Sequence, residues 1–223
     1  PRQEPGTRPA CALPYELSVE GALSEDATTL VVHFAAGVRL FGRRSAGAPF
    51  HVLAPGNVRS AEAGGVDWVS GRVWSYAVKA GDAIEGTFPL KDFEGGAYAL
   101  EVRGPNGFYR EMRGASDDPK LALSLSSQTD GSQGTGSAVL RIGNNEKLTR
   151  KVRVTDRSYG APLREFELPG GGTPVELILS LAGSGDWYDL EVQVDGLPKF
   201  LRRYAGRMES GRETISDPKM GDT

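Results

Sequence analysis

The sequence has little cysteine and histidine, no long apolar run and no excess of positive charge. Cys11 is the only cysteine, which excludes an internal disulfide framework and a thiolate metal cluster. No apolar stretch approaches the roughly 18 residues of a membrane-spanning helix. The 26 basic and 29 acidic side chains leave a net charge of −3, whereas nucleic-acid-binding domains usually show a strong basic excess. Neither a nucleic-acid partner nor a transmembrane segment is therefore expected.

Sequence motifs for catalysis and metal binding are also missing. The two histidines, His33 and His51, lack the H-x-x-H or H-E-x-x-H spacing of metal-binding pairs. There is no G-x-S-x-G nucleophile elbow and no phosphate-binding P-loop. The acids Asp117–Asp118, Asp186 and Asp189 lack the D-x-D-x-D-G pattern of a calcium loop, so we interpret them as turn residues. We expect no catalytic, metal-binding or cofactor-binding residue in this chain.

Turn-forming residues are abundant, and the apolar residues between them alternate with polar ones. Glycine contributes 30 and proline 14 of the 223 residues, which favours many turns and short strands. Alternation at 17–19, 30–34, 98–102 and 188–192 places one set of side chains on a buried face. About fourteen short strands at close spacing are typical of β-sandwiches. We therefore expect an all-β, immunoglobulin-like fold.

An internal repeat divides the chain in two. The segment YALEV at 98–102 matches YDLEV at 188–192, and in each half a glycine turn and a strand with an F-x-R motif follow. We predict two related β-sandwich domains of about seven strands each. Their tyrosine, leucine and valine residues at the repeated strand are expected to form the cores. The predicted boundaries are a linker at 1–14, a first domain at 15–116, a second domain at 117–210 and a tail at 211–223.

The first half has two insertions that the second half lacks. One lies in VRLFGRRSAGA (38–48), which has three arginines and two large apolar residues but no acid. The other lies in VRSAEAGGVDWVSGR (58–72), which contains Trp68. Insertions usually form surface loops, where binding residues concentrate. A lipid surface or another domain would bury Leu40 and Phe41 and compensate the positive charge of the neighbouring arginines.

The F-x-R strands, FYREMR (108–113) and FLRRYAGR (200–207), admit two interpretations. Their arginines and aromatic rings can bind lipid head groups, or Phe108 and Phe200 can be core residues with arginine stems covering the sheet. Because both halves keep the motif, packing is favoured for the shared part. The candidate residues for a lipid or docking surface are Arg39, Leu40, Phe41, Arg43, Arg44, Trp68, Tyr109, Arg113, Arg203, Tyr204 and Arg207.

The ends of both repeats resemble the C-terminal domain of bacterial phospholipase C of the non-haemolytic, phosphocholine-specific type. The resemblance rests on GAYALEVRGPNGFYREMRG (96–114) and GDWYDLEVQVDGLPKFLRRYAGRMESG (185–211), and it extends to 1–17 and SDPKMG (216–221). In that family, two such domains follow a metal-dependent catalytic domain that cleaves phosphatidylcholine or sphingomyelin. The resemblance therefore implies an upstream catalytic domain as a partner and a secreted or periplasmic bacterial enzyme of lipid catabolism.

The expected function follows from this resemblance. The chain would be a non-catalytic region without a cofactor, which docks on the catalytic domain and assists contact with a membrane lipid surface. Two alternatives stay open: a carbohydrate-binding or adhesion module, and a pair of domains with a purely stabilising role. The carbohydrate alternative predicts that Trp68, Trp74 or Trp187 lines a concave face.

Overall fold

The computed structural model describes residues 6–60, 67–131 and 133–220. Within these ranges the structure consists of β-strands and single-turn 3₁₀ helices, which confirms the all-β prediction. The first half contains β2 (Leu17–Leu23), β3 (Thr29–Ala36), β4 (Ala48–Arg59), β5 (Trp68–Val78), β6 (Ala83–Pro89), β7 (Tyr98–Arg103) and β8 (Tyr109–Gly114). The second contains β9 (Leu121–Asp130), β10 (Gln133–Asn144), β11 (Arg150–Asp156), β12 (Arg164–Leu168), β13 (Val175–Ser180), β14 (Trp187–Val194) and β15 (Leu201–Arg207).

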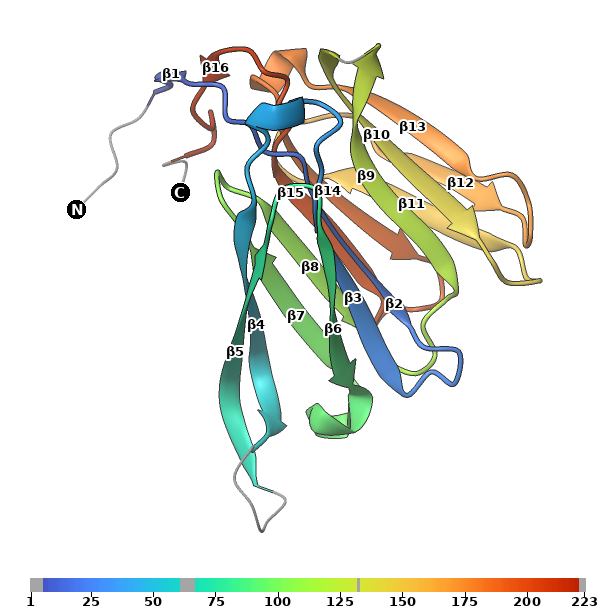
Figure 1. The fold of residues 1–223 in the computed structure, drawn as a ribbon. Helices are drawn as coiled ribbons and strands as arrows, with labels where there is room; N and C mark the ends of the chain where they lie inside the picture. Colours follow the sequence, from blue (N-terminus) through green and yellow to red (C-terminus); the bar gives the residue numbers. More distant parts are fainter. Residues whose placement is uncertain (1–5, 61–66, 132, 221–223) are drawn as a thin grey trace.

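The two halves have the same topology and share one sheet. The order of the eight-stranded sheet is β12-β11-β14-β15-β8-β7-β4-β5, so β8 of the first half pairs with β15 of the second. A three-stranded sheet faces each half of it, with order β2-β3-β6 in the first half and β13-β10-β9 in the second (Figure 1). Every strand pairing is antiparallel among the described residues. Each half is thus a sandwich of seven strands.

Each sandwich has its own hydrophobic core between its two sheets. Tyr98 and Tyr188 are 2% and 4% exposed, and the leucine and valine that follow each of them on the same face are also buried. The predicted core face of the repeated strand is therefore confirmed. The alternation arises because successive side chains of a strand point to opposite sides of the sheet.

The two ends of the described chain lie together. Strand β1 (Pro9–Ala10) pairs with β16 (Thr214–Ile215) at one end of the molecule (Figure 1). The carbonyl oxygen of Cys11 accepts a hydrogen bond from Arg207 Nη1 at 3.1 Å, and the N–H of Leu13 donates to Glu209 Oε2 at 3.1 Å. These contacts attach residues 9–13 to the second half, whereas the sequence predicted an extended linker there.

Candidate functional site

The two domains meet where their last strands, β8 and β15, pair with each other. Both strands carry the F-x-R motif, and because they are antiparallel, equivalent residues of the two repeats are related by an approximate twofold axis. Arg110 lies opposite Tyr204 in this register, and Arg202 lies opposite Met112. The exposed fractions of Arg110 and Arg202 are 2% and 4%. The motif therefore places two buried arginines between the domains.

Each of these arginines reaches the tyrosine of the other repeat. Arg110 Nη1 donates to the hydroxyl of Tyr188 at 3.2 Å, and Arg202 Nη2 donates to the hydroxyl of Tyr98 at 2.7 Å. Each guanidinium also lies over the phenylalanine ring of its own motif, with Cζ 4.0 Å and 4.5 Å from the two ring centroids. We call Arg110, Arg202, Tyr98 and Tyr188 the arginine seam. The packing interpretation expected arginine stems that cover the sheet. In the structure, the guanidinium groups of Arg110 and Arg202 are buried as well.

An internal carboxylate compensates the charge of Arg202. Asp118 Oδ2 lies 3.2 Å from Arg202 Nη2, and both side chains are at most 5% exposed. Asp118 also accepts hydrogen bonds from the hydroxyl of Tyr98 and, at 2.8 Å, from the N–H of Ala115. Sequence analysis assigned Asp118 to a solvated turn. Its position at the domain boundary, two residues beyond the first predicted domain, was the only signal of a structural role.

Arg110 has no such partner. Among the described residues, no carboxylate oxygen lies within 4.0 Å of its guanidinium nitrogens. Its hydrogen bonds to Tyr188 and to the carbonyl oxygens of Tyr109 and Ala205 all leave from Nη1, and its Nε is buried without a partner. The equivalent arginines thus have unequal electrostatic surroundings.

Glu20 of β2 is the acid that acts on Arg110 from a greater distance. Its carboxylate accepts hydrogen bonds from the N–H of Leu125 at 3.3 Å and from the hydroxyl of Tyr204 at 3.1 Å, so it connects the first domain to the second. Desolvation raises the pKa of Glu20 from 4.5 to about 7, although Arg110 acts to lower it. Near neutral pH, Glu20 therefore carries only part of a negative charge.

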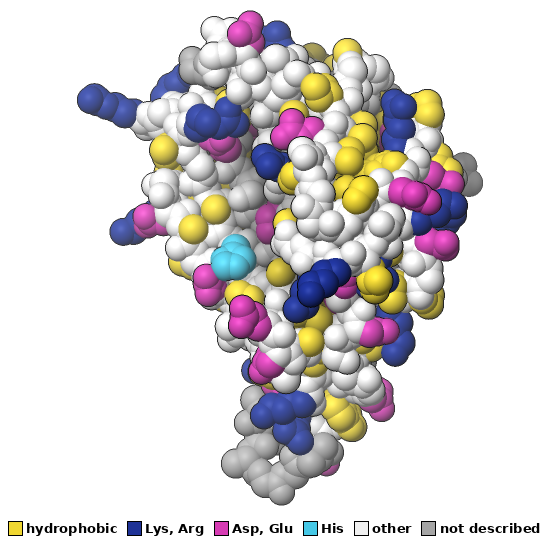
Figure 2. All heavy atoms as spheres, turned by 90° about the vertical axis from the view of Figure 1, so that its right-hand side faces the viewer, with side chains coloured by type: hydrophobic (Ala, Val, Ile, Leu, Met, Phe, Trp, Pro, Cys, Tyr) yellow, Lys and Arg dark blue, Asp and Glu magenta, His cyan; other side chains and the backbone are white. Residues whose placement is uncertain are grey.

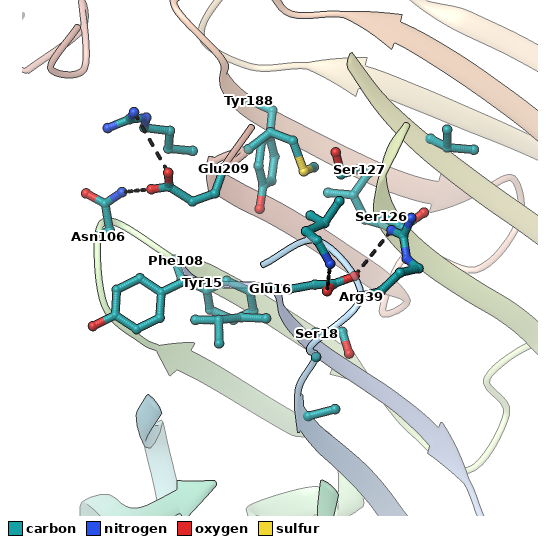
Figure 3. A pocket seen from close by; sticks show the side chains of 18 of the residues that line it. Tyr15, Glu16, Ser18, Arg39, Asn106, Phe108, Ser126, Ser127, Tyr188 and Glu209 are labelled. Carbon is teal, nitrogen blue, oxygen red and sulfur yellow. Dashed lines mark hydrogen bonds and ion pairs between the residues drawn. The ribbon is translucent and has the colours of Figure 1, made fainter. Parts of the chain in front are cut away.

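A cavity of about 560 Å³ opens beside Arg110, between β2 of the first domain and β9 of the second. Figure 3 shows that side chains from both domains surround it. Arg110 and Tyr188 come from the eight-stranded sheet, Phe108 directly precedes β8, and Ser126 and Ser127 come from β9. The apolar part of the lining consists mainly of Leu17, Leu40, Leu125, Val139 and Met208.

One side of this cavity holds the first part of the 38–48 loop. Arg39 Nη2 pairs with Glu16 Oε1 at 3.2 Å, and Glu16 Oε2 accepts the N–H of Leu40 at 2.9 Å (Figure 3). Arg39 Nη1 also donates to Thr129 Oγ1 on β9 at 3.0 Å. Two of the predicted surface residues, Arg39 and Leu40, therefore belong to the interdomain cavity.

The other side of the cavity holds Glu209. Its Oε1 accepts a hydrogen bond from Asn106 Nδ2 at 2.5 Å, and its Oε2 lies 3.8 Å from Arg207 Nη2 (Figure 3). Burial raises the pKa of this carboxyl, and the surrounding donors oppose that rise. Arg207 is 8% exposed, so its placement on an open surface was wrong. Tyr204 was also expected at the surface, but it is 3% exposed within the second core.

Tyr109, Arg113 and Arg203 lie on the outer face of the eight-stranded sheet. The Tyr109 ring has the guanidinium carbons of Arg103 and Arg203 at 5.4 Å and 5.5 Å from its centroid. Arg203 forms two hydrogen bonds with Asp189, from Nε to Oδ1 at 2.7 Å and from Nη2 to Oδ2 at 2.8 Å. Arg113 pairs with the neighbouring Glu111. These arginines are therefore already neutralised by acids of the chain.

The rest of the 38–48 loop forms the helix η1 (Gly42–Arg44) and its flanks. Arg43 and Arg44 are exposed, and neither forms an ion pair with a described residue. Phe41 is half-buried, as is Leu40, so the two apolar side chains expected to need a partner are largely covered already. Val38 is the exposed apolar residue of the loop, at 44%.

The three tryptophans lie in different surroundings, and one of them, Trp187, lines a cavity of about 670 Å³. Trp68 is 38% exposed at the start of β5, in the long β4–β5 hairpin. Trp74 packs edge-on against Phe88, with ring centroids 5.2 Å apart. Trp187 is 8% exposed and donates from Nε1 to the carbonyl oxygen of Ile215 at 3.0 Å. Residues 61–66 of the second insertion lie outside the described residues.

The described part of the chain contains no group of three or more histidine, cysteine or acidic side chains placed to hold a metal ion. No helix within it has the length and apolar character needed to cross a membrane. Basic and acidic side chains are intermingled over the side of the molecule in Figure 2, and no broad patch of one charge forms there.

Comparison with known proteins relates this architecture to one family. The family described as bacterial phospholipase C, C-terminal domain, matches residues 9–115 and again 119–207. Non-hemolytic phospholipase C from Pseudomonas aeruginosa is 34% identical over 99% of this chain and 30% of its own length. Its namesake from Burkholderia pseudomallei is 34% identical over 98% of this chain and 28% of its length.

Two further comparisons complete this picture. Hemolytic phospholipase C from Pseudomonas aeruginosa is 32% identical over 98% of this chain and 30% of its own length. The chain thus spans about 30% of the length of the curated relatives that it matches. Among solved structures, red sea bream transglutaminase is 13% identical over 92% of this chain and 31% of its own, with a TM-score of 0.26.

Proposed function

Because the chain belongs to the family of bacterial phospholipase C C-terminal domains, we propose that it is the non-catalytic C-terminal region of such an enzyme and docks on the catalytic region that precedes it. The parent enzyme would hydrolyse phosphatidylcholine or sphingomyelin outside the cytoplasm, in the medium or the periplasm. Its catalytic and metal-binding residues would lie in the upstream region.

The observation that carries the docking proposal is the arrangement of one end of the molecule. Strands β1 and β16 lie there, and the 38–48 loop with η1 lies at the same end (Figure 1). An upstream region would therefore emerge at the same end of the molecule as the loop that carries exposed Val38, Arg43 and Arg44. An apolar side chain beside two unpaired cations suits a protein surface that offers an acid and a small apolar patch.

Contact with lipid would be the weaker part of this function. Of the arginines proposed for a lipid surface, Arg39, Arg113 and Arg203 are paired with acids, and Arg207 is buried. Arg43 and Arg44 remain, and a basic residue near an anionic membrane contributes about 1 kcal/mol. Two such residues give weak, salt-sensitive attraction that assists the enzyme at a membrane but does not anchor it.

The test is a comparison of two variants of the full-length enzyme. One carries Val38→Ser, Arg43→Ser and Arg44→Ser, and the control carries Lys147→Ser and Leu148→Ser in an exposed loop of the second domain. We expect the first variant alone to lower the melting temperature of the catalytic region or its activity on phosphatidylcholine. Unchanged stability and activity in the first variant would refute docking through this end.

A vesicle experiment on the 223-residue chain separates docking from lipid contact. Co-sedimentation with anionic vesicles is compared at low and high salt, for the native sequence and the Arg43→Ser, Arg44→Ser variant. We expect weak binding at low salt that the variant loses. An absence of binding to anionic vesicles at low salt would eliminate the lipid contribution and leave docking to be judged by the first experiment.

A further inference from the structure

The interdomain cavity contains one feature that neither docking nor lipid contact uses. Arg110 is almost fully buried, its charge has no ion-pair partner among the described residues, and it lines a cavity of about 560 Å³. Burying an unpaired charge is costly, and proteins normally compensate it with a carboxylate, a metal or a ligand. The equivalent Arg202 follows this rule through Asp118, and the cavity that borders Asp118 measures only about 80 Å³.

The hydrogen bonds of Arg110 use one terminal nitrogen of its guanidinium and leave the other without a partner among the described residues. All of them leave from Nη1, and no hydrogen bond among the described residues involves Nη2, whereas Nε is buried without an acceptor in Arg110 and Arg202 alike. A guanidinium nitrogen such as Nη2 donates charge-assisted hydrogen bonds to a carboxylate or a phosphate. Asp118 uses this same nitrogen of Arg202, because its Oδ2 lies 3.2 Å from Nη2.

The other side chains of the cavity indicate which groups a bound anion would carry besides its charge. The acids of the cavity are already occupied, since Glu16 pairs with Arg39 and Glu209 accepts hydrogen bonds from Asn106 and Leu13. Ser126 and Ser127 add hydroxyl groups from β9. The apolar side chains of the lining offer a surface for a short hydrocarbon part.

We propose that this cavity is a binding site for a small organic anion, whose carboxylate or phosphate group takes at Arg110 the place that Asp118 takes at Arg202. The apolar part of the ligand would lie against the leucines of the lining. Because residues of both domains form the cavity, the bound anion would also strengthen the contact between them. This inference does not depend on the docking proposal.

The experiment measures binding of four probes to the 223-residue chain by calorimetry in a low-chloride buffer. Acetate and inorganic phosphate represent the anionic groups alone, and hexanoate and hexyl phosphate add an apolar part. We expect hexanoate or hexyl phosphate to bind more tightly than its smaller counterpart, and the better of the two identifies the anionic group. Arg110→Gln should weaken this binding by about 10- to 100-fold, because hydrogen bonds to a charged group are lost.

Two further variants keep the test decisive if Arg110→Gln does not fold. Ser126→Trp places a large ring in the cavity and leaves Arg110 intact, and we expect it to abolish binding. Ser124→Trp is the matched control, because Ser124 is exposed on the same strand and the same face but does not line this cavity. The proposal is overturned if none of the probes binds the native chain, or if Ser126→Trp binds them as tightly as Ser124→Trp does.

Discussion

The two halves of the arginine seam use the same motif but compensate a buried charge differently. Arg202 has Asp118 at 3.2 Å, whereas the described acid that acts on Arg110 is Glu20, which lies beyond ion-pair distance and is partly protonated, and Arg110 borders a cavity. Packing and hydrogen-bond geometry are thus shared by the repeats, while the electrostatics of the two sites differ. The difference indicates that the Arg202 side contributes stability and that the Arg110 side is available for binding.

The largest effect is expected where the charge is compensated. Asp118→Ala should lower the free energy of unfolding by about 3–5 kcal/mol, because it leaves Arg202 buried without a counterion. Urea denaturation of the 223-residue chain measures this change. Asp117→Ala is the control, because that neighbouring acid is exposed and should cost less than about 0.5 kcal/mol. Equal effects of the two substitutions would show that the pair does not stabilise the seam.

Equivalent core positions should behave alike. Leu100→Ala and Leu190→Ala should each cost about 2–5 kcal/mol, because both leucines are buried at matching places in the two cores. Denaturant melts of the two variants test this expectation. If the two costs are similar, the difference between the repeats lies in the arginine seam and not in the hydrophobic cores. A cost below about 0.5 kcal/mol at either position would mean that the side chain is not packed as the structure shows.

The pH dependence of the unfolding free energy should show that Glu20 only partly compensates the charge of Arg110. Folding raises the pKa of Glu20 from 4.5 to about 7, so the native state holds this proton more tightly than the unfolded state does. Stability linked to Glu20 is therefore full below about pH 4.5 and is lost as the pH rises through about 7. The loss is on the order of 1–3 kcal/mol.

Glu20→Gln isolates this contribution, because glutamine cannot titrate, its amide oxygen can accept the N–H of Leu125, and its amide nitrogen can donate to the hydroxyl oxygen of Tyr204. We expect the difference in unfolding free energy between the native chain and this variant to change between pH 5 and pH 8. Parallel pH profiles for the two proteins would contradict the assigned pKa.

The smallest effect is expected at Arg110 itself. Arg110→Met should change the free energy of unfolding by less than about 1 kcal/mol without ligand, because lost hydrogen bonds are offset by relief from burying an uncompensated charge. Arg202→Met serves as the comparison and should cost several times more, because it leaves Asp118 buried without its counterion. Equal costs for both variants would remove the distinction between the two sites.

Sequence patterns predicted the strands of each domain and the faces of their repeated strands. Alternation fixed the burial of Tyr98 and Tyr188, and the repeat indicated two domains. The pairing of β8 with β15 could not be predicted, because a strand rich in arginine and aromatic residues is compatible with both a surface and a buried interface. The role of Asp118 was missed for a similar reason, since a turn acid and a buried counterion look identical in one sequence.

Double-mutant cycles on the two acid–arginine combinations test the central comparison most directly. One cycle removes Asp118 and Arg202, the other removes Glu20 and Arg110, and both use urea denaturation at neutral pH. We predict a coupling free energy of about 2–3 kcal/mol for Asp118 with Arg202 and less than about 1 kcal/mol for Glu20 with Arg110. Equal coupling in the two cycles would show that both arginines are compensated from within the chain and would contradict the account.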